Sequence, residues 1–591
     1  MKKVGLAKDS NQLSIYLSAT ILVNLFCLFI NGYPADLGYW ENWSHQLEKN
    51  GYYLFNGNYP PLYIHWLYLV TKILNYFSLP IEPNDLCKFL WELPVLISHC
   101  LLVAIVYKNL EKFKATRSES LGLMLMTVFN PAILIDGPIW GQVDLIPVVI
   151  AISAVLLNFS QGYAVLMLPT FTLALLTKFQ MVCFLPVIGV LFFHRIKTHL
   201  VGIVISALIF LIVFSPFIYV HYFKEAFQAA YIETLGQYPV ITMNAANLWI
   251  LLVGNNAPDN IEFLSHLSKF LPQQLTYPKY LGMFFYASIC LAIFILGISD
   301  LVKARGSATE NLLSKSLLLS LVSAISFFTL LPAMHERYLF PAVICALVYS
   351  SITKKHWVYV VALSTVSALN MLIILGINGS DIWTGLSLLV TILFALSLLH
   401  LFAEDQGYNA VVDLTKSLFN SPLSPLIVFV AGIGLTFSYL VDRHTIRKPT
   451  VANNQMLLTN QHLLSASQGY GTIQFNRSLD GKTLSVGKRR FAVGIGTHAY
   501  SSIVFQLPAK TIGFEVIPGV DDEVSSTELG FEIWEDDKLR WASKPYYGFE
   551  KAEKVYVKLN KGHELKLIVK PNGENAWDHA DWINPIVTLE K

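Results

Sequence analysis

The sequence predicts a polytopic α-helical membrane domain followed by an all-β domain, and three observations carry this prediction. Of the 591 residues, 54% are hydrophobic and only 14% are charged, whereas a soluble protein carries about a quarter charged residues. The charges are also unevenly divided: 37 of the 150 residues from Asp442 onward are Lys, Arg, Asp or Glu, against 45 of the preceding 441. We therefore expect lipid to surround the first part and water to surround the second.

Cysteine usage follows the same division. All six cysteines lie in the apolar part, and the sequence contains no Cys-x-x-Cys pair and no Cys/His cluster. The absence of such motifs excludes the common structural zinc sites and dithiol redox sites. The polar part contains no cysteine, so it must fold without a disulfide. The formal net charge of +2 gives no indication of nucleic acid as a partner.

The apolar part contains thirteen runs with lengths close to the 17–25 residues that a membrane span needs. The first run follows a basic N-terminus. We expect it to stay as a transmembrane helix, because it is longer than the apolar core of a signal peptide and no small-x-small cleavage site follows it. About thirteen transmembrane helices are therefore expected within residues 1–441. The runs lie near residues 13–31, 88–108, 118–135, 145–159, 163–177, 180–193, 200–220, 280–298, 316–333, 338–352, 357–376, 383–402 and 424–441.

Basic residues between the runs indicate the orientation, because loops rich in Lys and Arg stay in the cytoplasm. Their alternation is regular only if residues 62–79 form a re-entrant or surface-lying helix instead of a span. The N-terminus is then cytoplasmic and residues 442–591 are extracytoplasmic, in a multi-pass protein of the cell (plasma) membrane. The basic segments are the N-terminus with Lys2, Lys3 and Lys8, and the loops 108–117, 195–197, 303–305 and 354–355.

Polar residues gather at the expected external ends of the runs, where ionisable groups are costly unless they are paired or functional. Each has a structural explanation: an interfacial aromatic belt, a helix break at Tyr59-Pro60-Pro61, or an ion pair within His335-Glu336-Arg337. Together they fit a site for an anionic, lipid-linked sugar. Arg and Lys bind phosphate, amides and tryptophans bind sugar, and a carboxylate can deprotonate an attacking hydroxyl.

Seven motifs stand at these positions in a fixed order along the chain. They are Asp36, Tyr59-Pro60-Pro61-Leu62, Asn130-Pro131, Trp140-Gly141-Gln142-Val143-Asp144, Lys178-Phe179-Gln180, Asn244 to Trp249, and His335-Glu336-Arg337-Tyr338. Together they resemble the GT-C superfamily of integral-membrane glycosyltransferases. The similarity covers residues ~13–400 and is to prokaryotic relatives of the GPI mannosyltransferases and, more distantly, to the dolichyl-phosphate-glucose-dependent glucosyltransferases.

The resemblance implies an inverting hexosyltransferase that uses a polyprenyl-phosphate sugar on the external membrane face, with no separate cofactor. It implies that Asp36 is the general base on the acceptor hydroxyl, and that His335, Arg337 and Lys178 bind the donor phosphate. Preorganised cations would stabilise the charge that develops on the departing phosphate. The acceptor is a glycan, a lipid or a protein, and the lipid bilayer is itself a partner.

A wider set of residues is expected to bind substrate. Asp136 and Asp144 are rival acids to Asp36, and Asp144 either holds the acceptor or caps a helix. No pair of closely spaced acids of the Asp-x-Asp type is present in the expected site to hold a nucleotide-bound metal, so we expect no metal requirement. The expected substrate-binding residues are Tyr59, Trp140, Gln142, Asp144, Gln180, Asn244, Asn247 and Glu336.

After Val441, short alternating apolar segments with turn residues between them predict an all-β sandwich or jelly roll. We expect a linker at 442–464 and an extracytoplasmic domain at 465–591. Its motifs resemble the NPCBM carbohydrate-binding module. They are Gly494-Ile495-Gly496-Thr497-His498-Ala499, Gly519-Val520-Asp521-Asp522 and Trp577-Asp578-His579-Ala580-Asp581-Trp582.

The resemblance makes five residues of this domain candidates for sugar binding. The structural alternative is that His498, Asp578 and His579 only hold loops together by hydrogen bonding, as buried polar clusters often do. Trp582 is one of several tryptophans that offer stacking surface. The five candidates are His498, Asp578, His579, Asp581 and Trp582.

Two other functions fit the composition. A transporter or flippase of lipid-linked sugars would explain polar residues in a membrane cavity, but it predicts internal repeats and charges near the middle of spans. We find neither in the sequence. A non-catalytic glycan-binding membrane protein would use the same sugar-binding residues and would not need Asp36.

Overall fold

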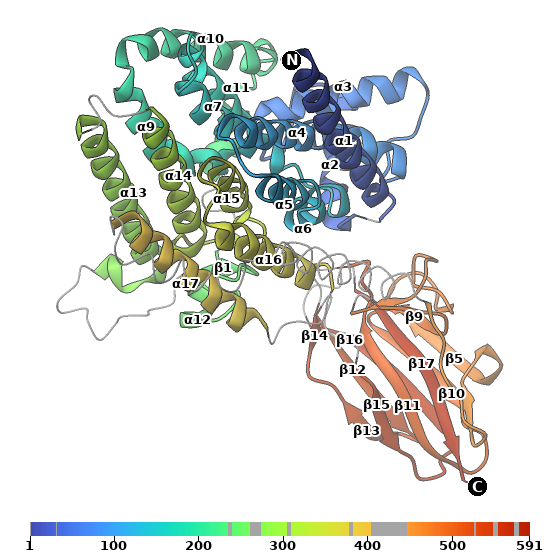
Figure 1. The fold of residues 1–591 in the computed structure, drawn as a ribbon. Helices are drawn as coiled ribbons and strands as arrows, with labels where there is room; N and C mark the ends of the chain where they lie inside the picture. The colour runs from blue at the N-terminus through green and yellow to red at the C-terminus, as the bar shows by residue number, and fades with distance from the viewer. Residues whose placement is uncertain are drawn as a thin grey trace. The chain divides into compact units, whose positions relative to one another are not determined.

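The computed structural model divides the chain into two compact units, Met1–Ile433 and Gly434–Lys591, called here the helical unit and the β domain (Figure 1). Each is described by itself. The structure describes residues 2–30, 32–233, 239–259, 273–303, 309–376, 382–402, 446–487, 489–524, 528–547, 553–572 and 578–590.

The helical unit is built almost entirely from helices. Two strands of two residues each, β1 (Thr242–Met243) and β2 (Met334–His335), are its only β elements within the described ranges. The α-helices are α1 (Lys2–Leu28), α2 (Pro34–Asn50), α3 (Pro61–Tyr76), α4 (Asp85–Lys112), α5 (Arg117–Val128), α6 (Pro131–Leu134), α7 (Leu145–Asn158), α8 (Met167–Thr177), α9 (Leu185–His194), α10 (Ile196–Tyr219), α11 (Phe223–Phe227), α12 (Leu248–Val253), α13 (Pro278–Lys303), α14 (Thr309–Leu330), α15 (Phe340–Thr353), α16 (Trp357–Ile374) and α17 (Trp383–Phe402).

Eight helices in the described part of the chain are long and apolar enough to cross a membrane, and four more apolar helices are shorter. These twelve correspond to the first twelve runs expected from the sequence. The thirteenth, near 424–441, lies outside the described residues, and the expected count of about thirteen spans is not shown. The eight are Asn11–Leu28, Asp85–Lys112, Arg117–Ile139, Ile196–Tyr219, Pro278–Val302, Glu310–Leu330, Trp357–Ile374 and Trp383–Leu401.

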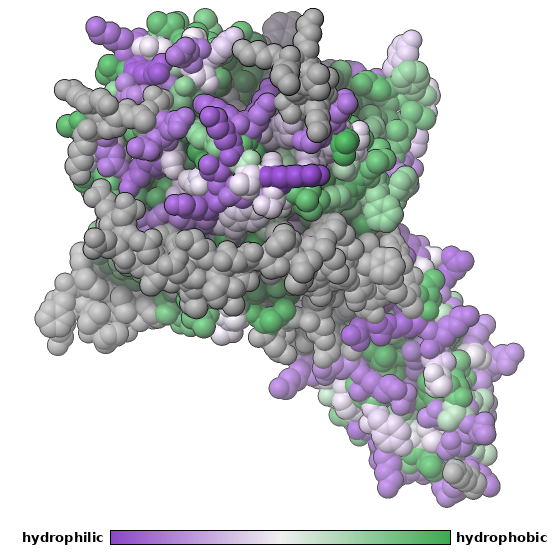
Figure 2. Space-filling model, viewed as in Figure 1, coloured by the Kyte–Doolittle hydropathy of each residue, from purple (hydrophilic) through white to green (hydrophobic). Residues whose placement is uncertain are grey.

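Large apolar side chains remain exposed along several of these helices, as expected for surfaces that contact lipid. Only 17% of the most apolar window is buried in α10, and the same holds for α13. Figure 2 shows a broad apolar area on the right-hand flank of the helical unit, whereas the visible face of the β domain is mostly hydrophilic. The two surfaces therefore suit different solvents, in agreement with the charge distribution in the sequence.

Residues 62–79 were expected to form a helix that does not cross fully. The structure has α3 here, whose 16 residues begin at Pro61 and are not among the eight candidate spans. Its buried residues recur at helical spacing, with Ile64, Leu67 and Leu74 on one face. The helix before it, α2, also buries a single face. A pair of one-sided helices therefore stands where the sequence predicted an external segment.

A buried lysine joins three segments next to this pair. Lys88, in the first turn of α4, is 3% exposed. Its ammonium donates to the carbonyl oxygens of Ile30 at 2.6 Å and Pro138 at 2.7 Å, and it lies 4.0 Å from the Glu92 carboxylate. Lys88 and Glu92 do not stand out in the sequence, because both residues lie within an otherwise apolar run. Lys88 therefore provides hydrogen bonds to backbone carbonyls that have no partner within their own helices, at the end of α1 and in the π-helical turn that contains Pro138.

The chain between α5 and α7 is irregular because proline and asparagine interrupt it. Asn130 caps α6, since its side-chain oxygen accepts from the amides of Ala132 and Ile133, while its Nδ2 donates to Ser364 at 2.9 Å. A π-helical turn, η1 (Ile135–Ile139), follows and contains Pro138. Such turns are frequent at functional sites. This one places Asp136 and Trp140 inside the helical unit.

The β domain consists of two main sheets and one small sheet. The first has the order β13-β12-β16-β10-β5, with β14 on β12; the second has the order β15-β11-β17-β9-β6, with β4 on β17; the third is β3-β8-β7. This confirms the β-sandwich predicted from the alternating segments. The strands are β3 (Ile446–Arg447), β4 (Gln455–Leu457), β5 (Leu463–Gln468), β6 (Gln474–Phe475), β7 (Ser485–Val486), β8 (Arg489–Phe491), β9 (Gly494–His498), β10 (Ser501–Gln506), β11 (Thr511–Val520), β12 (Glu528–Glu535), β13 (Lys538–Ala542), β14 (Tyr546–Tyr547), β15 (Val555–Lys558), β16 (Glu564–Pro571) and β17 (His579–Leu589).

The segment expected as a linker, 442–464, belongs in its described part to this domain. Strand β3 pairs in parallel with β8, and β4 pairs antiparallel with β17. The sequence did not reveal these strands, because they are only two and three residues long and have no alternating pattern. The described strands of the β domain therefore begin at Ile446, inside the segment expected as a linker.

Candidate functional site

A cavity of about 330 Å³ lies within the helical unit. Its walls come from α2, the loop before α3, the turn after η1, the 3₁₀ segment η3 (Phe179–Phe184), α13 and the loop around β2. Seven of the residues expected from the sequence line it together, although they are spread over 300 positions of the chain. They are Asp36, Tyr59, Gln142, Lys178, Gln180, His335 and Arg337.

Asp36 lies in the first turn of α2 and is 8% exposed. Its Oδ2 accepts a hydrogen bond of 2.5 Å from the indole Nε1 of Trp140, and Arg337 Nη1 lies 3.6 Å from the same oxygen. Among the described residues, no hydrogen bond reaches its second oxygen, Oδ1. The carboxylate is therefore oriented through one oxygen, and the other remains for a group in the cavity.

The helix that carries Asp36 is fastened to the turn that carries Trp140. The indole Nε1 of Trp40 donates to the carbonyl of Gly141 at 2.8 Å, and the amide of Tyr33 donates to the carbonyl of Trp140 at 2.8 Å. Gly141 has φ +96°, and a Cβ there would lie 2.7 Å from Leu37 Cδ2, so this close contact requires glycine. The position of Asp36 therefore depends on these contacts with the turn.

Arg337 contacts three carboxylates at the base of the cavity. Its Nη1 is 2.8 Å from Glu336 Oε1 and 3.6 Å from Asp36, and its Nε is 3.7 Å from Asp144 Oδ2. A planar guanidinium presents five N–H donors in a fixed fork, so it can face several carboxylates from different sides. Among the described residues, no hydrogen bond occupies Nη2. Arg337 therefore holds the acids in place and keeps a donor for a ligand.

Asp144 lies behind the cavity wall and is fully buried. Lys178 contacts it through a short ion pair, and Gln180 Nε2 lies 3.5 Å from the same oxygen. The Lys178 ammonium also lies 5.1 Å from the centre of the Tyr59 ring, and the Tyr59 hydroxyl donates to Gln142 at 3.2 Å. Asp144 thus positions the two cations of the site and does not itself line the cavity. Its helix-capping alternative is also unsupported, since no side-chain cap hydrogen bond is formed at α7.

The residues before Arg337 are buried in the loop around β2. Burial, with Arg337 and Lys178 nearby, lowers the pKa of His335 well below its ordinary value. The imidazole is therefore neutral at physiological pH and offers one N–H donor without a positive charge. Burial raises the pKa of Glu336, while Arg337 acts in the opposite direction. Of the three expected phosphate ligands, only Arg337 and Lys178 bring charge.

Five of the eight expected substrate-binding residues are not among the residues that line the cavity: Trp140, Asp144, Asn244, Asn247 and Glu336. The two asparagines have structural roles instead. Asn247 is fully buried and caps α12: its side-chain oxygen accepts from the amide of Trp249 at 3.0 Å, and its Nδ2 donates to the carbonyl of Phe328 at 3.2 Å. Asn244 exchanges hydrogen bonds with Asn255. These amides therefore support β1, which pairs in parallel with β2 and so positions His335.

The opposite wall contains a pair that sequence reasoning missed. Lys279, in the first turn of α13, donates to Asp259 Oδ2 at 2.6 Å, and both residues line the cavity. The available signal was the Tyr277-Pro278-Lys279 sequence at a helix start, which resembles Tyr59-Pro60-Pro61 in position. Tyr39 and Trp43, on the face of α2 that carries Asp36, also line the cavity. The cavity is thus lined by aromatic side chains from α2 and by two separate charged groups, Asp36 with Arg337 and Lys279 with Asp259.

In the β domain, the expected histidines lie side by side. Strands β9 and β17 pair His498 with His579, and the two rings are 5.8 Å apart. Both residues are 5% exposed. His579 Nδ1 donates a hydrogen bond to Glu523 Oε2 at 3.3 Å, which raises the pKa of His579 above its ordinary value. Asp578 is buried as well, so these side chains have little surface for a ligand.

Trp582 was expected to offer stacking surface, but the structure places it in the core. Its side chain is fully buried and its ring lies 5.1 Å from that of Phe531. Residues on β17 alternate between faces, so Ala580 and Trp582 face the core while His579 and Asp581 face away from it. The sequence revealed this alternation but not that Trp582 lies on the face toward the main hydrophobic core.

We expect Trp582→Ala to destabilise the β domain by about 3–5 kcal/mol, because it removes the largest buried side chain of this core and leaves a cavity. Chemical unfolding of the full chain, followed by fluorescence, would measure the loss. Trp541→Ala is the matched control, since Trp541 is only partly buried beside the same core and is expected to cost less. Equal losses in the two variants would contradict the core placement.

Comparison with known proteins concerns mainly the β domain. Alpha-1,3-galactosidase B of Akkermansia muciniphila is 30% identical over 127 residues, which are 21% of this chain and 16% of the galactosidase. A CBM51 from Clostridium perfringens GH95, solved in complex with methyl-galactose, is 31% identical; the match covers 23% of this chain and 99% of that one, with a TM-score of 0.22.

One similarity extends over most of the chain. Arabinosyltransferase EmbB of Mycobacterium smegmatis matches 98% of this chain and 64% of its own, at 11% identity and a TM-score of 0.32. This likeness is too low to assign a fold or an activity to the helical unit. By contrast, residues 454–588 match the sequence model of the NPCBM/NEW2 domain, which bears out the resemblance seen in the sequence. The C-terminal part of this chain is therefore an NPCBM-like domain joined to a helical unit with candidate membrane spans.

Proposed function

We propose that this chain is an inverting GT-C glycosyltransferase that transfers a hexose from a polyprenyl-phosphate donor to a glycan, lipid or protein acceptor. The observation that carries the proposal is the cavity in which Asp36 lies beside Arg337 and Lys178. A carboxylate with one free oxygen and two cations within a single enclosed site suits the transfer of a sugar from a phosphate to a hydroxyl.

In this mechanism the acceptor hydroxyl lies at Asp36 Oδ1. Asp36 takes the proton as the hydroxyl oxygen attacks the anomeric carbon, and the bond between that carbon and the phosphate oxygen breaks. Because attack and departure take place on opposite sides, the configuration at that carbon is inverted. The hydrogen bond from Trp140 fixes the carboxylate, which reduces the reorganisation needed during reaction.

The leaving phosphate gains negative charge in the same step. Arg337 and Lys178 are held by Asp144, and Arg337 also by Glu336, so their positions are set before the donor arrives. Preorganised cations of this kind stabilise developing charge more than mobile ones do. Neutral His335 supplies a hydrogen bond to the same group. The aromatic wall formed by Tyr39, Trp40 and Trp43 on α2 supplies surface for the sugar ring.

The basic loops of the sequence and the position of Asp36 before α3 support an external location for the chemistry. The chain is then a multi-pass protein of the plasma membrane. Its N-terminus lies in the cytoplasm and its NPCBM-like domain lies on the external side. There the β domain binds or positions glycan acceptors.

A transfer assay tests this proposal. Purified full-length protein in detergent is incubated with synthetic polyprenyl-phosphate hexoses (mannose, glucose and galactose in separate reactions) and with membrane extracts as acceptors. We expect at least one lipid-linked hexose to be transferred, with inversion at the anomeric carbon, while nucleotide-diphosphate sugars stay intact. In a parallel experiment with the protein reconstituted in sealed vesicles, movement of labelled donor across the bilayer without any transferred product would instead support a flippase.

A further inference from the structure

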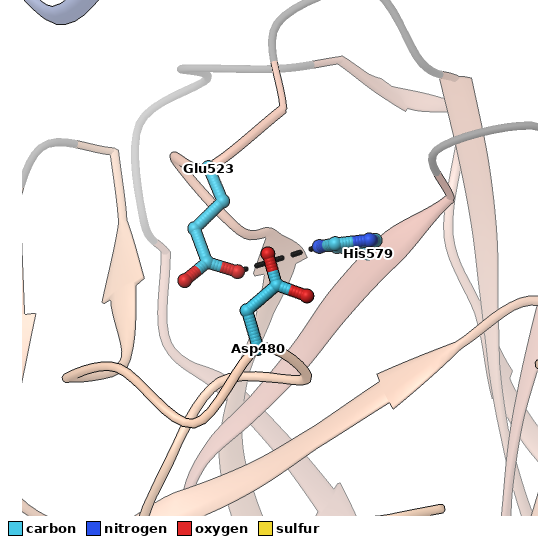
Figure 3. Close-up of side chains that lie close together, drawn as sticks. All are labelled: Asp480, Glu523 and His579. Carbon is cyan, nitrogen blue, oxygen red and sulfur yellow. Dashed lines mark hydrogen bonds and ion pairs between the residues drawn. The ribbon is translucent and has the colours of Figure 1, made fainter. Parts of the chain in front are cut away.

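Three side chains of the β domain that are far apart in the sequence meet at one point (Figure 3). Asp480 lies in the turn after β6, Glu523 follows β11, and His579 begins β17. Their carboxylate oxygens and imidazole nitrogen all lie within 4.8 Å of one another. Figure 3 shows the two carboxylates pointing toward the ring of His579. Glu523 is held in this position by a 2.6 Å hydrogen bond from Ser478.

A second observation points to a ligand at the same place. Asp581 is fully buried, and no backbone amide or basic side chain among the described residues donates a hydrogen bond to its carboxylate. It lies two positions after His579 on β17, so the two side chains are on the same face of the strand. Asp521, also fully buried, interacts with it. An unpartnered buried carboxylate is costly unless a cation or a proton compensates it.

The cations available from the protein are too few to balance these acids. Among the described lysines and arginines, Lys482 forms ion pairs with the cluster. Its Nζ lies 3.6 Å from Glu523 and 3.9 Å from Asp480. Its side chain is 69% exposed, so it contributes little in water. The cluster therefore has an excess of carboxylates around one imidazole.

We propose that Asp480, Glu523 and His579 bind a divalent transition-metal ion, Zn²⁺ or Mn²⁺, with the buried carboxylate of Asp581 stabilising it from behind. An imidazole combined with carboxylates suits these ions better than Ca²⁺ or Mg²⁺, which prefer oxygen ligands alone. The ion replaces the direct contact between His579 and Glu523, and it ties the loops after β6 and β11 to the start of β17. The site does not depend on the function proposed for the helical unit.

The test uses the full-length protein, stripped of metal by a chelator and dialysed. Binding of Zn²⁺, Mn²⁺ and Ca²⁺ is measured separately by calorimetry, and bound metal is counted by mass spectrometry. The variants are Asp480→Asn and Glu523→Gln. The matched control is Asp537→Asn, because Asp537 is a highly exposed acid of the same domain that pairs with Lys566 at 3.3 Å.

We expect the wild type and D537N to bind one equivalent of Zn²⁺ or Mn²⁺ that D480N and E523Q bind at least tenfold more weakly. Zn²⁺ or Mn²⁺ should also raise the unfolding temperature of the wild type but not of these two variants. Asp480 is exposed, so D480N retains the fold, and equal unfolding temperatures in chelator verify this. Equal metal binding by wild type and D480N, or binding of Ca²⁺ alone, overturns the proposal.

Discussion

Replacing Asp36 with asparagine is expected to lower kcat for hexose transfer by about 10²–10⁴-fold, the usual contribution of a general base. The amide keeps the shape of the side chain and can still accept from Trp140, but it cannot take a proton. Donor binding should change little, because the phosphate is held by other residues. Single-turnover rates and donor affinity, measured on the same preparation, separate the two effects.

The control for this variant is Asp85→Asn. Asp85 also lies in the first turn of a helix, α4, but it is exposed, so the same chemical change should leave transfer unaffected. Near-normal turnover in D36N would show that Asp36 is not the base. The remaining candidates for the base would then be Asp136 and Asp144, the two rival acids in the sequence.

Replacing Arg337 with glutamine has the second large effect. We expect kcat to fall by about 10²–10³-fold, since a preorganised donor to the leaving group is lost. The free energy of unfolding should also fall, by about 3–5 kcal/mol, because Asp36, Asp144 and Glu336 lose their common counter-charge while buried. Arg337→Lys should recover part of the stability and little of the activity, because one ammonium cannot reach all three carboxylates.

Thermal unfolding and transfer rates of both variants check this expectation, with Arg117→Gln as the control at an exposed helix start. A double variant, D36N/R337Q, adds a further test. The two residues are in contact, so their effects on kcat should be less than additive. Full activity in R337K would contradict a role that depends on the planar guanidinium.

Much of this site could be predicted from the sequence, because charged residues are rare in an apolar chain. Asp36, Lys178 and Arg337 stood out at the ends of apolar runs, and the structure brings all three to one cavity. Asp144 was also found, but not its position behind the wall. A pattern of residue types tells which groups are available, while the depth of each group depends on packing between distant segments.

The misplacements have physical reasons of the same kind. Asn247 was assigned to substrate because amides bind sugars, but an amide is equally suited to cap a helix, and the structure uses it there. Trp582 was assigned to a binding surface, because the alternation on β17 does not tell which of its two faces packs against the main hydrophobic core. Spacing rules could not group the proposed metal ligands, since Asp480 and Glu523 come from two separate loops and His579 from the start of β17.

The contacts of Lys88 have a consequence for how the chain is made. An ammonium within a membrane helix is stable only when acceptors surround it, and its acceptors come from Ile30 and Pro138, on either side of it in the sequence. During synthesis, the first of these carbonyls precedes the lysine and the second emerges fifty residues after it. We therefore expect a chain that ends before the π-helical turn to leave this ammonium with fewer acceptors, which links the stability of the first turn of α4 to residues 135–139.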